Sequence, residues 1–186
     1  MKLSLFKRTP GKKSETKKIR REGNVPGILY GVKQEVQNIY INGDAFQAIL
    51  RGLKPGLLST TIFALEDGAK TYSAIIKEIH YHPTTYAVEH VDFVVLESDT
   101  PVSVQIPIIV LGAADCPGIK LGGFMRQVIR KLKVRCLPKD IPQQFFLDIQ
   151  DLQVAGAKRL SDIAVPAAVR PLAKSMNEVA VVIAKR

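Results

Sequence analysis

The sequence has few cysteines and no long apolar segment. Its two cysteines, Cys116 and Cys136, lie far apart and form no Cys-x-x-Cys pair, which favours a reduced, cytosolic protein with two ordinary thiols. The longest apolar run falls well short of the roughly 18–20 residues that cross a bilayer, so we expect neither a membrane span nor a membrane partner. The first residues contain no apolar stretch long enough to act as a secretory signal.

Groups suited to catalysis are also scarce. The only histidines are His80, His82 and His90. His80 and His82 would share one face of a strand and could form a metal site with His90 and Asp92, but Pro83 bends the chain directly after them. Neither cysteine sits in an activating motif, and Gly122-Gly123 lacks the Gly-Lys-Ser/Thr of a phosphate-binding loop. We therefore predict no enzymatic activity, no metal and no cofactor.

Acidic residues are nearly missing from the start of the chain. The 186 residues carry 27 lysines and arginines against 17 acids, a formal net charge of +10 that favours a polyanionic partner. Nine of these basic residues lie in the first 21 positions, where Glu15 is the only acid: Lys2, Lys7, Arg8, Lys12, Lys13, Lys17, Lys18, Arg20 and Arg21. A solvated helix face is one interpretation. Neutralisation by a phosphate backbone explains such a cluster better, because like charges repel one another in a free monomer.

Alternating apolar residues predict a mostly β first half with two helices. The predicted helices are a weakly apolar one from Ser14 to Gly23, with Ile19 as its main anchor, and one capped by Asp44 that ends near Gly52. Strands are expected around Leu3 and Leu5 and over residues 27–30, 36–41, 57–65, 71–79 and 86–96. Together they predict a small, mostly antiparallel sheet that closes near residue 96.

A polar segment that ends in Pro101 predicts a domain boundary. We expect a first domain over residues 1–96, a linker over 97–101 and a second, β-rich domain over 102–186. The second domain should contain a short helix over residues 124–130 and strands over 102–110, 132–137, 145–149 and 179–183. The fold class is therefore mostly β with short helices.

The segment around His90 predicts a polar surface feature. Val91, Phe93 and Val95 alternate onto one face of a strand, which places His90 and Asp92 together on the opposite face. A carboxylate beside a basic cluster would repel a phosphate, but it can accept hydrogen bonds from base amino groups or 2′-hydroxyls in an RNA minor groove. The alternative is a solvated pair on a sheet surface.

The order and spacing of several short motifs resemble one known family. In the first half these are Arg8, Thr16-Lys-Lys-Ile-Arg20, Val25-Pro-Gly-Ile-Leu-Tyr-Gly31, His82-Pro83 and His90-Val-Asp-Phe93. In the second half they are Val104-x-Ile-Pro107, Gly112, Pro117-Gly118, Gly122-Gly123, Cys136-Leu-Pro-x-Asp-Ile-Pro142 and Leu160-Ser-Asp-Ile163. The chain thus resembles, over nearly its whole length, bacterial large-subunit ribosomal protein L twenty-five in its long form, also called CTC or general stress protein.

This resemblance implies a fold, a function and a set of contacts. It implies an N-terminal β-barrel of six or seven strands that binds loop E of 5S ribosomal RNA, a helical region of non-Watson–Crick pairs, followed by a β-rich C-terminal domain. By motif, the implied RNA contacts are Arg8, Lys17, Arg20, Tyr30, His90 and Asp92, with His80 as a further candidate. The basic cluster adds Lys12, Lys13, Lys18 and Arg21. The family often has arginine where this chain has Lys17 and Lys18, and lysine lacks the planar fork of arginine.

Two other functions compete with a structural role in the ribosome. A non-ribosomal or stress-linked RNA-binding module could use the same basic face, and an enzyme with a histidine-based site ranks third. The second half offers its own basic run, which could meet 23S ribosomal RNA or a neighbouring ribosomal protein: Arg126, Arg130, Lys131, Lys133 and Arg135.

Overall fold

The computed structural model describes residues 1–9, 13–32, 34–68 and 70–185. The chain divides into two compact units, Met1–Val102 and Ser103–Arg186. The expected linker over residues 97–101 lies at the end of the first unit, directly before the strand that begins at Val102. Among the described residues, no helix is both long and apolar enough to span a bilayer.

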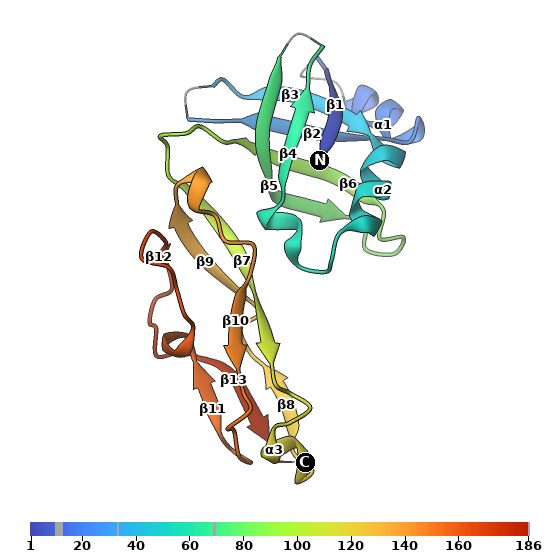
Figure 1. The fold of residues 1–186 in the computed structure, drawn as a ribbon. Coiled ribbons are helices and arrows are strands. Elements are labelled where there is room, and N and C mark those ends of the chain that lie inside the picture. Colours follow the sequence, from blue (N-terminus) through green and yellow to red (C-terminus); the bar gives the residue numbers. More distant parts are fainter. Residues whose placement is uncertain (10–12, 33, 69, 186) are drawn as a thin grey trace. The chain divides into compact units, whose positions relative to one another are not determined.

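The first unit is a closed six-stranded barrel, which confirms the expected architecture (Figure 1). Its strands are β1 (Lys2–Lys7), β2 (Asn24–Tyr30), β3 (Gln37–Asn42), β4 (Ile62–Glu66), β5 (Thr71–Tyr81) and β6 (Val88–Val95). They follow the order β1-β3-β2-β6-β5-β4 around the barrel. The pairs β2–β6 and β1–β4 are parallel and the other four are antiparallel.

Inward-pointing apolar side chains fill the barrel. Leu3 and Leu5 of β1 and Val91 and Phe93 of β6 point inward and are almost fully buried. The helix α2 (Gly43–Gly52) adds Phe46, which has no exposed surface and lies with its ring centroid 6.5 Å from that of Phe63. Removing these apolar groups from water supplies the main stabilisation of the unit.

Two details of the first unit differ from the sequence predictions. Asn42, rather than Asp44, caps α2, because its side chain accepts a hydrogen bond from the amide of Ala45 at 2.9 Å. Residues Leu57–Thr60 form a 3₁₀ helix instead of the start of a strand. The hydroxyls of Thr60 and Thr61 both donate to the carbonyl of Leu57, at 3.0 and 2.8 Å, and this local bonding competes with strand pairing.

The helix α1 (Lys13–Arg21) has no fully buried residue. Ile19 is half-buried, as befits the anchor predicted from the sequence. An isolated helix of this length is unstable in water, so its contact with the barrel determines where its charges lie.

The second unit contains two sheets and confirms the β-rich prediction. Its strands are β7 (Val102–Leu111), β8 (Phe124–Gln127), β9 (Lys131–Cys136), β10 (Phe145–Asp148), β11 (Ala157–Arg159), β12 (Arg170–Pro171) and β13 (Val179–Ala184). One sheet has the order β10-β7-β9-β12 and the other β11-β13-β8. Short helices lie between its strands: α3 (Pro117–Lys120) and the 3₁₀ helices Pro138–Asp140 and Leu160–Asp162.

The helix predicted over residues 124–130 was wrong. Residues 124–127 form β8 and pair antiparallel with β13, for example Met125 with Ile183. Pairing with a strand more than 50 residues away decides this conformation, and a local pattern does not contain that information.

The contact between Gly43 and Gly23 gives a stability prediction. A Cβ atom on Gly43 would lie 2.0 Å from the carbonyl oxygen of Gly23, whereas one on Gly52 in the same helix would meet nothing within 4 Å. We expect Gly43→Ala to destabilise the protein by about 1–3 kcal/mol through overpacking. Gly52→Ala should be neutral or stabilising by up to about 1 kcal/mol, since alanine restricts the unfolded chain. Thermal melting of both variants measures this, and equal melting temperatures would contradict the close approach.

Candidate nucleic-acid interface

Polar and aromatic side chains occupy the outer face of five adjacent barrel strands. Alternation with buried neighbours places seven side chains on this face: Phe6, Asn38, Tyr40, Ile28, Tyr30, His90 and Asp92. Three more lie beside them, because Arg8 bonds to Asn38, Glu78 pairs with Asp92 and His80 pairs with His90. The register aligns them in rows, because Ile28 lies opposite both Asn38 and Asp92, and His80 lies opposite His90. Five predicted contacts, Arg8, Tyr30, His80, His90 and Asp92, therefore share one face, which we call the outer sheet face.

Arg8 is held at one edge of this face. Its backbone amide donates to the carbonyl of Asn38 at 3.0 Å. The guanidinium donates to the side-chain oxygen of Asn38 at 3.0 Å and to the carbonyl of Ile39 at 3.2 Å. These bonds use part of the donor set and fix the plane of the group, so the remaining donors are pre-oriented. Asn38 is thus a positioning residue that the sequence analysis did not single out.

His90 and Asp92 form a close pair at the centre of the outer sheet face. Nδ1 of His90 lies 2.8 Å from Oδ1 of Asp92, and about a quarter of each side chain is exposed. Burial lowers the pKa of His90 below the usual value of 6.5, against the opposing effect of Asp92, and nearby His80 and Arg8 lower it further. The imidazole is therefore neutral at pH 7. Because the carboxylate can only accept, we assign the proton of the neutral imidazole to Nδ1, which leaves Nε2 as an acceptor.

A second carboxylate, Glu78, lies beside this pair and was missed by the sequence analysis. It pairs with Asp92 in the β5–β6 register, and its Oε1 is 3.8 Å from Nε2 of His80. Its place two residues before His80 on one strand was the signal that could have found it. The pKa of Tyr30 is raised, first by burial and then by the charges of Asp92 and Glu78, so its hydroxyl remains protonated.

The helix α1 brings the basic cluster next to the same strands. Nε and Nη2 of Arg20 both donate to the carbonyl of Glu89, at 3.2 and 3.0 Å, one residue before His90. Lys13, Lys17, Lys18 and Arg21 are exposed. Lys18 approaches only Glu22, at 3.9 Å, and Lys12 lies outside the described residues. The tertiary structure therefore places a helix of net positive charge beside the His90–Asp92 pair.

Two of the nine basic residues near the start of the chain, Lys2 and Lys7, pair with acids and add no free positive charge to this surface. Nζ of Lys2 lies 3.4 Å from Glu66, and Nζ of Lys7 lies 2.7 Å from Asp67. The hydrogen bond to Asp67 is the main reason why the pKa of Lys7 is raised. Both acids lie far from Lys2 and Lys7 in the sequence. The first 21 residues taken alone therefore indicate an unbalanced positive charge.

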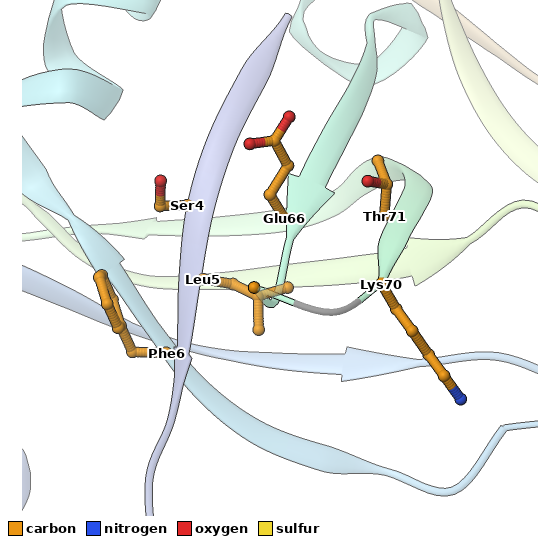
Figure 2. A pocket seen from close by; sticks show the side chains of 7 residues that line it. Ser4, Leu5, Phe6, Glu66, Lys70 and Thr71 are labelled. Carbon is orange, nitrogen blue, oxygen red and sulfur yellow. The ribbon is translucent and has the colours of Figure 1, made fainter.

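A hollow of the barrel beside β1 offers no catalytic arrangement. It has a volume of about 350 Å³ and lies between β1 and the β4–β5 turn (Figure 2). Glu66 and Lys70 line it, but their charged ends point away from each other, so they form no acid–base pair (Figure 2). Within the part of the chain that the structure describes, no three His, Cys, Asp or Glu side chains are arranged to hold a metal ion.

The basic run of the second unit is exposed. Lys131, Lys133 and Arg135 alternate with buried residues on β9 and share one face, while Arg126 lies on β8 and Arg130 between the two strands. Its expected partner, 23S ribosomal RNA or a neighbouring ribosomal protein, stays a prediction.

Comparison with known proteins identifies the family. The model of the ribosomal L25p family matches residues 3–93, and that of the ribosomal protein TL5 C-terminal domain matches residues 101–186. The large ribosomal subunit protein bL25 of Chlamydia abortus is 42% identical over the full length of both chains. The bL25 proteins of Chlamydia pneumoniae and Chlamydia trachomatis serovar D are 40% and 41% identical, also over both full lengths. This chain belongs to the bL25 family.

Membership of the bL25 family confirms several expectations. The relatives are structural ribosomal proteins rather than enzymes. The chain is thus a ribosomal protein of the large subunit, associated with ribosomes in the cytoplasm, and it has the long form in which a TL5 C-terminal domain follows the L25p domain.

The lowered pKa of His90 predicts a pH-dependent stability. A histidine that is harder to protonate in the folded state contributes fully above its unfolded pKa of about 6.5, and this contribution is lost as the pH falls through the folded-state value. We expect the free energy of unfolding to fall more between about pH 7.5 and about pH 5 in the wild type than in His90→Gln, whose side chain does not titrate. Urea denaturation at both pH values tests this. The same loss in both proteins would mean that other groups cause it.

Proposed function

We propose that this bL25-family chain binds loop E of 5S ribosomal RNA through α1 and the outer sheet face, as a structural component of the large subunit. The observation that carries the proposal is the juxtaposition of two unlike features. A helix with five basic residues and one acid, Glu15, lies directly beside the close His90–Asp92 pair. Together they fit an RNA that presents both phosphates and the exposed edges of distorted base pairs.

The helix supplies affinity and orientation. Lys13, Lys17, Lys18 and Arg21 extend into solvent, so each can approach a phosphate and release its counterions. Such contacts fix the position of the protein on the RNA but do not distinguish base sequences. Arg20 is bound to the carbonyl of Glu89, which ties the end of the helix to β6 and sets the distance between the phosphate contacts and the pair.

The pair supplies selectivity for a groove edge. With its proton on Nδ1, His90 presents Nε2 as an acceptor, and Asp92 presents its second carboxylate oxygen. The shallow minor groove of RNA displays 2′-hydroxyls and the edges of the bases, both of which include donors. Two acceptors side by side match such donors, and they repel a bare phosphate. The arrangement thus favours a widened or distorted groove such as that of loop E.

The neighbours of the pair complete the proposed contact surface. Arg8, oriented by Asn38, can donate to a base or a phosphate at one edge, and the protonated hydroxyl of Tyr30 can donate to a sugar or phosphate oxygen. His80 is a further candidate on β5. All these residues lie in Met1–Val102, so we propose that this unit is the RNA-binding domain.

The central prediction concerns Asp92. We expect Asp92→Ala to weaken binding to loop E RNA by about 1–3 kcal/mol, by analogy with base-edge contacts in DNA, and to spare weak binding to a plain duplex. His90→Ala should act in the same selective way, because it removes one acceptor and frees the other to move. Titration against both RNAs measures the effect.

Circular dichroism and melting must show that both variants are folded. A solvated pair without an RNA contact predicts the opposite result, since removing a negative charge beside a cationic helix would strengthen all binding. Equal or tighter loop E binding by folded Asp92→Ala would therefore refute direct recognition by the pair.

A second prediction distinguishes cations that contact RNA phosphates from cations that only face water. Arg21→Ala should weaken binding to loop E and to an unrelated duplex alike, and it should lower the log–log salt slope by about one unit. Lys7→Ala is the matched control, since Asp67 already neutralises Lys7, and it should leave the slope unchanged. The same slope in both variants would show that Arg21 only faces water.

A further inference from the structure

The turn between β5 and β6 is organised around His82. Nδ1 of its imidazole accepts hydrogen bonds from the amides of Thr84 and Thr85, both at 3.3 Å, and lies 3.0 Å from the hydroxyl of Thr84. The amide of His82 donates to the carbonyl of Ala87 at 2.8 Å, and its carbonyl accepts from the amide of Tyr86 at 2.9 Å. These bonds define one backbone course for the whole turn, including the conformation of Tyr86.

Tyr86 is strained and unpacked at the same time. Its φ is +54°, in the left-handed region that costs a bulky residue free energy and that glycine adopts readily. The side chain is 77% exposed, so burial does not compensate for the strain. Nothing in the fold of the barrel requires an aromatic ring here. An outlier of this kind points to a function for the side chain.

A cavity with both polar and apolar lining adjoins this turn. It has a volume of about 250 Å³ and lies between the end of α1, the start of α2 and the β5–β6 turn, whose residues on both sides of Tyr86 line it. Its polar lining residues are Arg20, Asn24, Gln47, His82, Thr85 and Glu89. The cavity is smaller than the pockets of about 300–1,000 Å³ that hold drug-sized ligands.

The chemistry of the cavity suits the edge of a nucleobase. Its lining has one cation and one carboxylate, so it has little net attraction for a phosphate. Two carboxamides, a hydroxyl and an imidazole offer both donors and acceptors, and a base edge carries the same mixture without charge. Tyr86 lies between two residues that line the cavity, Thr85 and Ala87. Exposed aromatic rings are the usual platforms on which proteins stack unpaired bases.

We propose that the β5–β6 turn binds one unpaired nucleotide of the RNA, whose base stacks on Tyr86 with its edge toward the cavity. The inference rests on the proposed RNA-binding function and adds a second contact to it. Arg20 connects the two sites, since it lines the cavity and belongs to the cationic helix that holds the phosphates. The outer sheet face would then recognise paired nucleotides in a groove, and the turn would recognise a nucleotide outside the stack.

The test uses the full chain, 5S ribosomal RNA and a plain duplex. Glycine relieves the strain at position 86 and removes the ring, so Tyr86→Gly should melt at the same temperature as the wild type or a few degrees higher. Its affinity for 5S RNA should fall about tenfold, the usual effect of losing one stacked base. Tyr86→Phe should retain wild-type affinity. Phe146→Leu, at another exposed aromatic residue on β10, is the control and should also bind normally.

The nucleotide that stacks on Tyr86 is located by measuring how readily the 2′-hydroxyl of each nucleotide in the RNA is acylated. The wild type and Tyr86→Phe should change the reactivity of one unpaired nucleotide, and Tyr86→Gly should lose that change while it keeps the loop E footprint. Wild-type affinity and footprint in Tyr86→Gly would overturn the proposal and leave the turn as a surface for a protein partner. An equal loss in Tyr86→Phe would overturn stacking in favour of the hydroxyl. A wild type that does not prefer 5S RNA over the duplex would instead refute the proposed function itself, and this inference with it.

Discussion

The parallel pairing of β2 with β6 is the constraint on which the candidate interface depends. It joins the N-terminal strands to β5 and β6 and so closes the barrel between segments about 60 residues apart. The strands approach very closely at Gly27, where a Cβ atom would lie 2.6 Å from the carbonyl oxygen of Val91. A larger residue would push β6 away from β2. The position of His90 and Asp92 relative to Arg8 and α1 follows from this one contact.

The interface combines opposite electrostatic features within a small area. Cations on α1 provide attraction that acts over a distance and depends on salt, whereas the acceptors on β6 act only at hydrogen-bond range. Burial keeps the imidazole of His90 neutral, which preserves its acceptor and leaves the charge of Asp92 only partly screened. Because a carboxylate opposes phosphate binding, its presence beside the helix has a cost in nonspecific affinity. That cost is reasonable where discrimination between RNA shapes matters more than strength alone.

The two proposed RNA contacts lie on different kinds of structure: the His90–Asp92 pair is on rigid strands, and Tyr86 is in a strained turn. The His90–Asp92 pair lies on paired strands within a closed barrel, so its geometry is fixed before any RNA arrives. Tyr86 lies in a turn whose backbone is held by hydrogen bonds to His82, including one from the amide of Tyr86 to the carbonyl of His82. Preorganisation of this kind reduces the entropy that is lost on binding. It also explains why a left-handed tyrosine can persist where glycine would cost less.

The sequence alone determined the fold class, the alternation of the barrel strands and the shared face of His90 and Asp92. These features follow from local periodicity, which the strand geometry transmits directly to space. The order of short motifs also indicated the family, which the comparisons confirm. Only the tertiary structure decided the conformation of residues 124–127, the neutralisation of Lys7 by Asp67 and the row that joins Arg8 to Asp92 through β3 and β2. Each depends on partners distant in the chain, and a one-dimensional pattern holds no record of which distant segments pair.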